Sequence, residues 1–272
     1  MSEAIVNEVN INESISETSM YQLNICHLYP DLLNLYGDRG NIIALAKRAS
    51  WRGIQASISS VTLGEAFDAE KYDIIFLGGG QDYEQEIIQD DLLMEKGNEI
   101  KSAIENNVVF LCICGGYQLL GKYYRTWEGK EINFLGALDL WTIGGKKRLI
   151  GNMVFECDFL KSDGSDGRNV CDGKVAGFEN HSGKTYLGPS VSPLGKVLKG
   201  GGNNGEDGFE GAMYKNVLCS YSHGSLLPKN PALADHLVER ALRRKYSQFT
   251  SLAALDDGFE KLAREAIISK LL

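Results

Sequence analysis

Short continuous hydrophobic runs alternate with segments of helical spacing along the first half of the chain. The runs "YDIIFLGGG" (72–80) and "VVFLCI" (108–113) lack the polar alternation of a half-exposed strand. Such strands are typical of a parallel sheet that helices cover on both faces. The pattern predicts strands at 21–29, 55–61, 72–80 and 108–113, with helices at 41–52 and 84–106. The fold class that follows is α/β, with a central, mostly parallel sheet flanked by helices.

The second half of the chain has a different pattern. Residues 148–226 contain several short β-like pieces separated by glycine-rich turns, which predicts a β-rich segment added to the sheet. A helix is expected from Pro231, with Asn230 as its cap, because these residue types favour a helix start. We expect one main domain over 21–248, a disordered acidic leader at 1–20 and a helical extension at 249–272.

Composition and charge exclude several classes of protein. The chain has 36 acidic and 28 basic side chains, a net charge of -8, whereas a nucleic-acid-binding protein needs a basic surface. No apolar run reaches the roughly 18 residues of a membrane span. The N-terminal segment has no basic start, so it does not resemble a secretory signal. Six cysteines without a CxxC pair then favour free thiols in the cytosol.

Cys114 stands where a buried strand ends and two glycines follow, in "CICGGYQLLG" (112–121). A strand–turn–helix of this kind presents a nucleophile at the carboxyl edge of a sheet, where ligand crevices form. The N–H group after the nucleophile then points toward a developing oxyanion. A buried cysteine before a glycine is more often simply packed, so the neighbouring residues have to decide between the two interpretations.

Two further features belong with a cysteine nucleophile. The glycines at 78–80 follow the preceding buried strand and offer a second backbone donor at the same edge, although they are also typical of a plain turn. The nucleophile also needs a base. His27 lies within the first strand and His236 on a helix, whereas His181 and His223 both follow strand-like runs. His223, at the end of an apolar strand, is the better base, but spacing alone does not decide.

Six motifs in consistent order resemble the class I glutamine amidotransferase family, in its cobyric-acid-synthase-like branch. They are "YPDLLNLYGDRGNI" (29–42), "GGGQDYEQ" (78–85), "CGGYQLLG" (114–121), "RLIGN" (148–152), "GFENHSGKT" (177–185) and "SHGSLLPKNP" (222–231). The "CGGYQ" motif alone indicates only a glutaminase-like turn, whereas "YGDRGN", "GFENH" and "HGSLLPKNP" are more selective. Within that branch the motifs are most similar to the glutaminase subunits of lipid II isoglutaminyl synthases. The resemblance implies a class I glutamine amidotransferase-like fold.

The resemblance also implies a mechanism and its residues. Cys114 would attack the side-chain amide of L-glutamine and form a thioester, with His223 as general base and acid. Arg148 would hold the α-carboxylate of the substrate, although by itself it looks like a solvated base. The residues implied for the oxyanion site and the substrate pocket are Gly79 or Gly80, Gly115, and Gln118.

One position departs from the common family pattern. Triad glutaminases carry a glutamate two residues after the catalytic histidine, and this chain has Ser225 there. The cobyric-acid-synthase-like branch also lacks that carboxylate. Either an acid elsewhere in this chain or a partner protein orients His223, and we expect the partner. The "YGDRGN" loop has no obvious part in hydrolysis; Asp38 and Asn41 would cap the following helix, and contact with a partner is the alternative.

The resemblance implies a heterodimer with a MurT-like Mur ligase subunit. That subunit would use ATP and Mg²⁺ to amidate the D-glutamate of lipid II at the cytoplasmic face of the membrane. This chain has no GxxxxGK[ST] motif and no plausible Rossmann fingerprint, so the nucleotide belongs to the partner and no cofactor or metal is expected here. Three alternatives stay open: a glutaminase serving a cobyric-acid-type amidation, another thiol hydrolase such as a peptidase, and an inactive interaction subunit.

Overall fold

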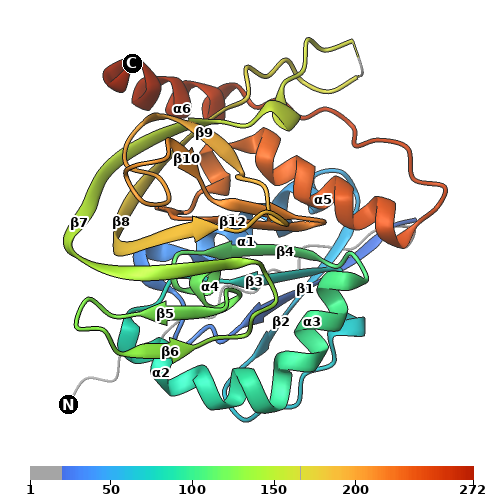
Figure 1. Ribbon diagram of the computed structural model, residues 1–272. Coiled ribbons are helices and arrows are strands. Elements are labelled where there is room, and N and C mark those ends of the chain that lie inside the picture. The colour runs from blue at the N-terminus through green and yellow to red at the C-terminus, as the bar shows by residue number, and fades with distance from the viewer. Residues whose placement is uncertain (1–19, 166) are drawn as a thin grey trace, which may run out of the picture.

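A six-stranded sheet forms the centre of the molecule (Figure 1). The computed structural model describes residues 20–165 and 167–272, so the expected leader at 1–20 lies outside the described residues except for Met20. Neighbouring strands are parallel except at one edge, where β11 is antiparallel to β12. The strands in spatial order are β11 (Ala212–Tyr214), β12 (Val217–Ser220), β4 (Val109–Ile113), β3 (Ile74–Leu77), β1 (Gln22–Leu28) and β2 (Gln55–Val61).

The hydrophobic runs of the sequence form the middle of this sheet. Strands β3, β4 and β12 are buried along their whole length, as expected for strands covered on both faces. Leu77 pairs with Cys112, and Ser220 pairs with Ile113, so the carboxyl ends of these three strands meet at one edge. The four strands predicted in the first half are confirmed, and the residues that follow them are brought together at that edge.

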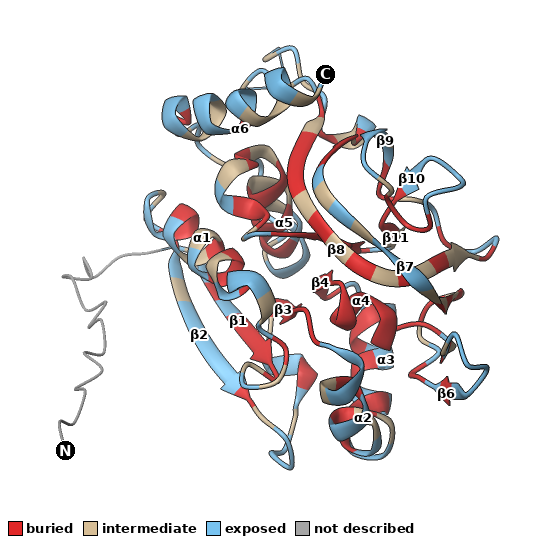
Figure 2. Ribbon diagram, turned by 90° about the vertical axis from the view of Figure 1, so that its left-hand side faces the viewer, coloured by how far each residue is buried: buried red, intermediate tan, exposed pale blue. Residues whose placement is uncertain are grey.

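Helices cover both faces of the sheet, with α1 (Arg39–Ser50) and α5 (Pro231–Lys245) on one side (Figure 2). The other side carries α2 (Asp82–Asp90), α3 (Gly97–Glu105) and the short α4 (Gly115–Leu119). The single helix expected at 84–106 is interrupted by a π-helical turn, η3 (Asp91–Lys96). At this turn the Asp91 carboxylate faces the interior, where it accepts the hydroxyl of Tyr29.

Helix α5 begins at Pro231 with Asn230 at its N-cap position, as predicted, but the Asn230 side chain makes no cap hydrogen bond. The Asn230 side chain binds the backbone N–H and carbonyl of Ala176 and the carbonyl of Leu226. The residue therefore ties the start of α5 to β8 of the second sheet.

The predicted β-rich segment is a second sheet built around a long antiparallel ribbon of β7 (Leu140–Glu156) and β8 (Lys174–Leu187). It begins earlier than residue 148, because β5 already pairs with β7. Its other strands are β5 (Tyr123–Arg125), β6 (Glu131–Asn133), β9 (Gly195–Lys199), β10 (Phe209–Glu210) and β13 (Ser222–His223). Short 3₁₀ turns lie at η1 (Leu35–Gly37), η2 (Ala69–Lys71), η4 (Asp158–Leu160) and η5 (Leu227–Lys229).

The C-terminal extension is helical only from Gly258, where α6 (Gly258–Leu271) begins. Residues 251–257 have no regular structure, so the helix predicted over this end is shorter than expected. Arg264 donates to the carbonyl of Lys174, which fastens α6 to the second sheet, while Phe259 on its outer face is 88% exposed. Among the described residues, no helix is long and apolar enough to cross a membrane.

Candidate active site

Cys114 lies between β4 and α4, at the carboxyl edge of the central sheet. Its N–H donates to the carbonyl of Ser220 at 2.8 Å, so the end of β4 is fixed against the end of β12. Its backbone has φ 49° and ψ −101°, a strained conformation for a residue with a side chain, as at the nucleophile turn of α/β hydrolases. The predicted strand–turn–helix is present, and only 8% of Cys114 is exposed.

Glycine is required after Cys114 because α4 begins against the end of β3. A Cβ on Gly116 would stand 2.7 Å from the Cβ and from the carbonyl oxygen of Leu77. A Cβ on Gly115 would stand 2.7 Å from the backbone nitrogen of Gly80. The two glycines therefore let the start of α4 approach the glycine segment that follows β3.

His223 reaches this edge because the chain passes there from one sheet to the other. β12 ends beside β4, and the next strand, β13, already pairs with β8. Burial alone would lower the pKa of the His223 imidazole, but the carboxylate of Asp38 and the thiol of Cys114 outweigh it and raise the pKa to about 10. Its Nε2 atom makes no aligned hydrogen bond with any described group and lies near the Cys114 thiol. No competing hydrogen bond therefore prevents a proton from passing between Nε2 and the sulfur.

Asp38 supplies a carboxylate to His223 from within this chain. Its Oδ2 and Oδ1 atoms lie 3.1 and 3.3 Å from His223 Nδ1, and both side chains are fully buried. The expectation that a partner protein would provide the missing acid is wrong for this contact. The expected capping role is wrong too: Asp38 makes no side-chain cap bond, and Asn41 accepts the N–H of Leu227 instead. The only sequence signal for this role was the "YGDRGN" motif itself.

His181, the other candidate base, makes different contacts. Its Nδ1 lies 2.7 Å from the carbonyl of Gly183, and its ring stacks on that of Tyr221 at 3.7 Å. His181 lines the same cleft as Cys114, but the carboxylate of Asp38 contacts His223 and not His181. The geometry thus favours His223 as the base.

A cleft of about 380 Å³ opens beside the thiol. Of the predicted site residues, Cys114, Gln118, Arg148 and Gly80 line it. The Gln118 amide is fixed from both ends: its oxygen accepts from Gln85 Nε2 at 2.9 Å, and its nitrogen donates to the Tyr221 hydroxyl at 3.0 Å. The structure therefore brings Gln118 to the cleft in a single orientation.

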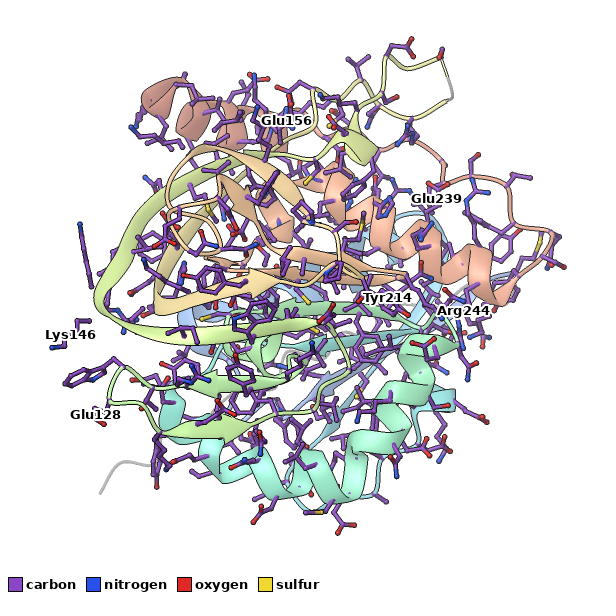
Figure 3. All side chains as sticks on the ribbon, in the orientation of Figure 1. Glu128, Lys146, Glu156, Tyr214, Glu239 and Arg244 are labelled. Carbon is purple, nitrogen blue, oxygen red and sulfur yellow. The ribbon has the colours of Figure 1, made fainter. Side chains whose placement is uncertain are left out.

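Arg148 reaches the cleft from an irregularity in the β7–β8 ribbon. The pairing register shifts between Gly144 and Leu149, and the segment between them leaves the ladder. Arg148 Nε donates to the Asn180 side-chain oxygen and a terminal nitrogen donates to the Asn180 carbonyl, both at 3.0 Å. Lys146 in the same segment points outward at the edge of the molecule (Figure 3), with its ammonium 4.3 Å from the Trp127 ring.

Tyr36 and Asn180 were not found by the sequence analysis. Asn180 donates its side-chain amide to the Tyr36 hydroxyl at 2.6 Å, and the Tyr36 ring meets the His223 ring edge-on at 4.9 Å. Both residues line the cleft, so contacts run continuously from Arg148 through Asn180 and Tyr36 to His223. Neither had a sequence signal beyond its place in the "YGDRGN" and "GFENH" motifs.

The backbone donors near the thiol correct one prediction. The N–H of Gly79 donates to Asp38 Oδ2 at 2.8 Å, so it does not face the thiol as an oxyanion donor. Gly80 lines the cleft, and Gly115 provides the first N–H of α4, where a helix leaves its donors unpaired. Gly80 and Gly115 therefore stay the candidate oxyanion donors, whereas Gly79 does not. Among the described side chains, no group of three or more His, Cys, Asp or Glu is placed to hold a metal ion.

Comparison with known proteins places this site in a family. The model of the CobB/CobQ-like glutamine amidotransferase domain matches residues 24–231. The GatD subunit of lipid II isoglutaminyl synthase (glutamine-hydrolyzing) from Streptococcus pneumoniae is 45% identical over 239 residues, 87% of each chain. The GatD subunit from Staphylococcus aureus is 41% identical over 92% of this chain and 97% of its own. The probable cobyric acid synthase of Methanosphaera stadtmanae is 32% identical, but the match covers 31% of its length.

Solved structures agree with the predicted fold class. PurLQS from Thermotoga maritima superposes with a TM-score of 0.52 at 18% identity, covering 82% of this chain and 96% of that one. The glutaminase domain of Trypanosoma brucei CTPS superposes with a TM-score of 0.51 at 10% identity, covering 86% and 98%. These likenesses confirm the class I glutamine amidotransferase-like α/β fold. With the family model matching most of its length, the chain belongs to the CobB/CobQ-like glutamine amidotransferase family.

Proposed function

We propose that this chain is the glutaminase subunit of a lipid II isoglutaminyl synthase, which hydrolyses L-glutamine and delivers the ammonia to a second subunit. The observation that carries glutamine hydrolysis is the line of contacts from Asp38 through His223 to Cys114, which ends at the cleft. The similarity to the two GatD subunits along nearly their whole length supports lipid II amidation over a cobyric-acid-type reaction.

In the first half of the reaction, Cys114 forms a thioester. The raised pKa of His223 places the proton of the Cys114–His223 pair on Nε2, and the Cys114 sulfur attacks the δ-carbonyl carbon of glutamine as a thiolate. The carbonyl oxygen becomes an oxyanion, to which the N–H groups of Gly80 and Gly115 donate. As the C–N bond breaks, His223 returns the proton to the leaving nitrogen and ammonia departs.

In the second half, water hydrolyses the thioester. His223 takes a proton from the water, whose oxygen attacks the thioester carbonyl, and then protonates the Cys114 sulfur as glutamate leaves. Asp38 keeps Nδ1 of the ring occupied through both halves, so Nε2 always faces the reacting atoms. Arg148 holds the α-carboxylate of glutamine and Gln118 forms part of the pocket wall.

The ammonia acceptor lies on another subunit in this proposal. A MurT-like Mur ligase would use ATP and Mg²⁺ to activate the D-glutamate α-carboxyl of the lipid II stem, and ammonia would convert it to D-isoglutamine. The pair would act in the cytoplasm at the inner face of the membrane. The amidotransferase domain would comprise 21–248, with 249–272 as an extension outside the catalytic unit.

The test replaces the nucleophile and follows two products. Cys114→Ser should lower glutamate release from L-glutamine by at least about 1,000-fold, because a serine hydroxyl is a poor nucleophile at a site built for a thiol. Cys171→Ser, which changes a half-buried thiol outside the cleft, should leave turnover unchanged. With the ligase subunit, ATP, Mg²⁺ and lipid II, the wild-type chain should produce amidated lipid II.

Two results would contradict the proposal. Full glutamate release by the Cys114→Ser chain would show that hydrolysis does not proceed through a thioester on Cys114. Cleavage of small glutamine-containing peptides as fast as glutamine would make the chain a general thiol hydrolase. Assaying the chain alone and with the ligase also shows whether Asp38 suffices to orient His223 without a partner.

A further inference from the structure

The cleft beside Cys114 carries one side chain of each charge. Among its described lining residues, Arg148 is the only Lys or Arg and Asp82 the only Asp or Glu. Free glutamine carries an α-carboxylate and an α-ammonium group on one carbon atom. The proposed function assigns Arg148 to the carboxylate and leaves the ammonium group without a contact.

Asp82 is positioned by the turn that follows the glycine segment. It is the first residue of α2, and reciprocal bonds between Gln81 and Glu84 close the first helical turn around it. Asp82 Oδ2 accepts the hydroxyl of Tyr124 at 3.4 Å, and Tyr124 also lines the cleft. Among the described residues no basic side chain forms a salt bridge with Asp82, so its carboxylate is available to a positive group of the ligand.

The environment of Asp82 favours an added cation. Asp82 is an exposed residue, but the protein atoms around its carboxyl group still raise its pKa by desolvation. A positive group beside the carboxylate would offset that desolvation. The Tyr124 hydroxyl supplies one hydrogen bond and leaves acceptor sites on the carboxylate.

Arg148 lies near Asp82 without touching it. Desolvation raises the pKa of both Asp82 and Tyr124, and the charge of Arg148 partly offsets this rise, yet no salt bridge joins Arg148 to Asp82. Two opposite charges that are close but separated suit a ligand that carries both complementary charges on one carbon. The thiol of Cys114 and the amide of Gln118 line the same cleft, where the side chain of glutamine would extend.

We infer that Asp82 binds the α-ammonium group of glutamine, that Tyr124 positions the Asp82 carboxylate, and that Asp82 and Arg148 together select the free amino acid. This inference rests on the proposed glutaminase function. In a peptide the α-nitrogen is a neutral amide, so glutamine within a chain loses the contact with Asp82. The pair of charges thereby protects glutamine residues of other proteins from hydrolysis.

The experiment compares two substrates on two proteins. L-Glutamine is paired with 5-amino-5-oxopentanoate, which has the same carboxylate and side-chain amide but no α-amino group. Asp82→Asn should lower kcat/KM for L-glutamine by about 10-fold, chiefly through KM, because a charge-assisted bond made equally in ground and transition states is lost. For the analogue the same substitution should change kcat/KM by less than about 2-fold.

Controls separate recognition from folding and from catalysis. Asp90→Asn changes an exposed carboxylate at the other end of α2, outside the cleft, and should match wild type on both substrates. Thermal melting reports whether Asp82→Asn is folded. L-Glutamine binding by Cys114→Ser, with and without Asp82→Asn, measures the contact without turnover and should show the same loss.

Equal losses on both substrates would overturn the inference, because they would give Asp82 a purely structural role. An unchanged kcat/KM for L-glutamine would overturn it as well. A chain that binds L-glutamine through Asp82 but does not hydrolyse it would contradict the proposed function and support this contact, so the two failures are distinguishable.

Discussion

Two donors hold the carboxylate of Asp38 in the interior. Gly79 N–H donates to it at 2.8 Å, and His223 Nδ1 lies 3.1 Å away on the other side. A carboxylate on Nδ1 fixes the tautomer and the orientation of the ring, which leaves Nε2 for the thiol. Asp38 thus acts on Cys114 through His223 and is a positioning residue.

Asp38→Asn tests whether the carboxylate of Asp38 positions the His223 ring. Asparagine keeps the size of the side chain and an oxygen for the Gly79 N–H, but it loses the charge that stabilises a protonated imidazole. We expect kcat/KM for glutamine to fall by roughly 100-fold, within the range that general acid–base catalysis contributes. Asp31→Asn, an exposed acid in the same loop, should have no effect. Equal effects of the two substitutions would contradict the assignment.

The same variant has a pH signature that loss of packing would not produce. The folded-state pKa of His223 is raised from 6.5 to about 10, so the protonated ring stabilises the folded state. That contribution is complete below pH 6.5 and is lost as the pH rises through about 10. The difference in unfolding free energy between wild type and Asp38→Asn should therefore be largest near pH 6 and should narrow toward pH 10. Urea unfolding at several pH values measures it, and a constant difference would count against the ion pair.

At the scale of elements, sequence predicts what local patterns determine. The buried strands β3 and β4 were predictable because strands covered on both faces need continuous apolar runs, and the turn at Cys114 followed from its glycines. The π-helical turn at 91–96 was not, since its apolar spacing resembles that of an unbroken helix. The register shift at 145–148, which places Arg148, depends on the pairing of β7 with β8, a contact distant in sequence that no local pattern specifies.

Gly116→Ala tests the packing of one element against another. Alanine favours a helix over glycine by about 1 kcal/mol, so local propensity alone predicts stabilisation. The added Cβ would meet Leu77 at 2.7 Å, and the backbone there cannot move easily, so we expect a net loss of roughly 1–3 kcal/mol in unfolding free energy. Gly258→Ala, in the first turn of α6 with only a flexible Asp256 oxygen at 3.2 Å, should be neutral or stabilising. Denaturant unfolding distinguishes the two, and stabilisation by Gly116→Ala would refute the close approach of α4 to β3.

At the scale of the whole molecule, contacts distant in sequence complete what the motifs begin. Asp38 and His223 meet because α1 and the strand β13 converge on one edge, and nothing in either local sequence specifies that distance. A helix cap was the simpler interpretation of an aspartate before α1, because aspartate commonly caps helices. The role of a residue that acts through such a contact cannot be predicted from its local sequence and requires the assembled structure.

A second long-range set of contacts fastens the C-terminal extension and is separate from the cleft. The buried Arg48 guanidinium of α1 contacts Asp235 of α5 at 2.6 Å and Asp257, just before α6, at 2.7 Å. Asn169 also donates to Asp257, so three segments meet at this one carboxylate. No residue of α6 lines the cleft, which predicts that stability and catalysis separate here.

Asp257→Asn should weaken the attachment of α6 without changing catalysis. Removing one charge from a buried pair leaves the other charge unpaired, which lowers the free energy of unfolding by about 3–5 kcal/mol. Because Arg48 keeps its contact with Asp235, we expect a smaller loss of roughly 1–3 kcal/mol. Limited proteolysis should cut within 246–257 faster than in wild type, while kcat/KM for glutamine stays unchanged. Asp256→Asn, the exposed neighbour, should resist proteolysis like wild type. If Asp257→Asn lost activity in proportion to stability, α6 would have to support the active site through the body of the domain, and the extension could not be treated as separate from the catalytic unit.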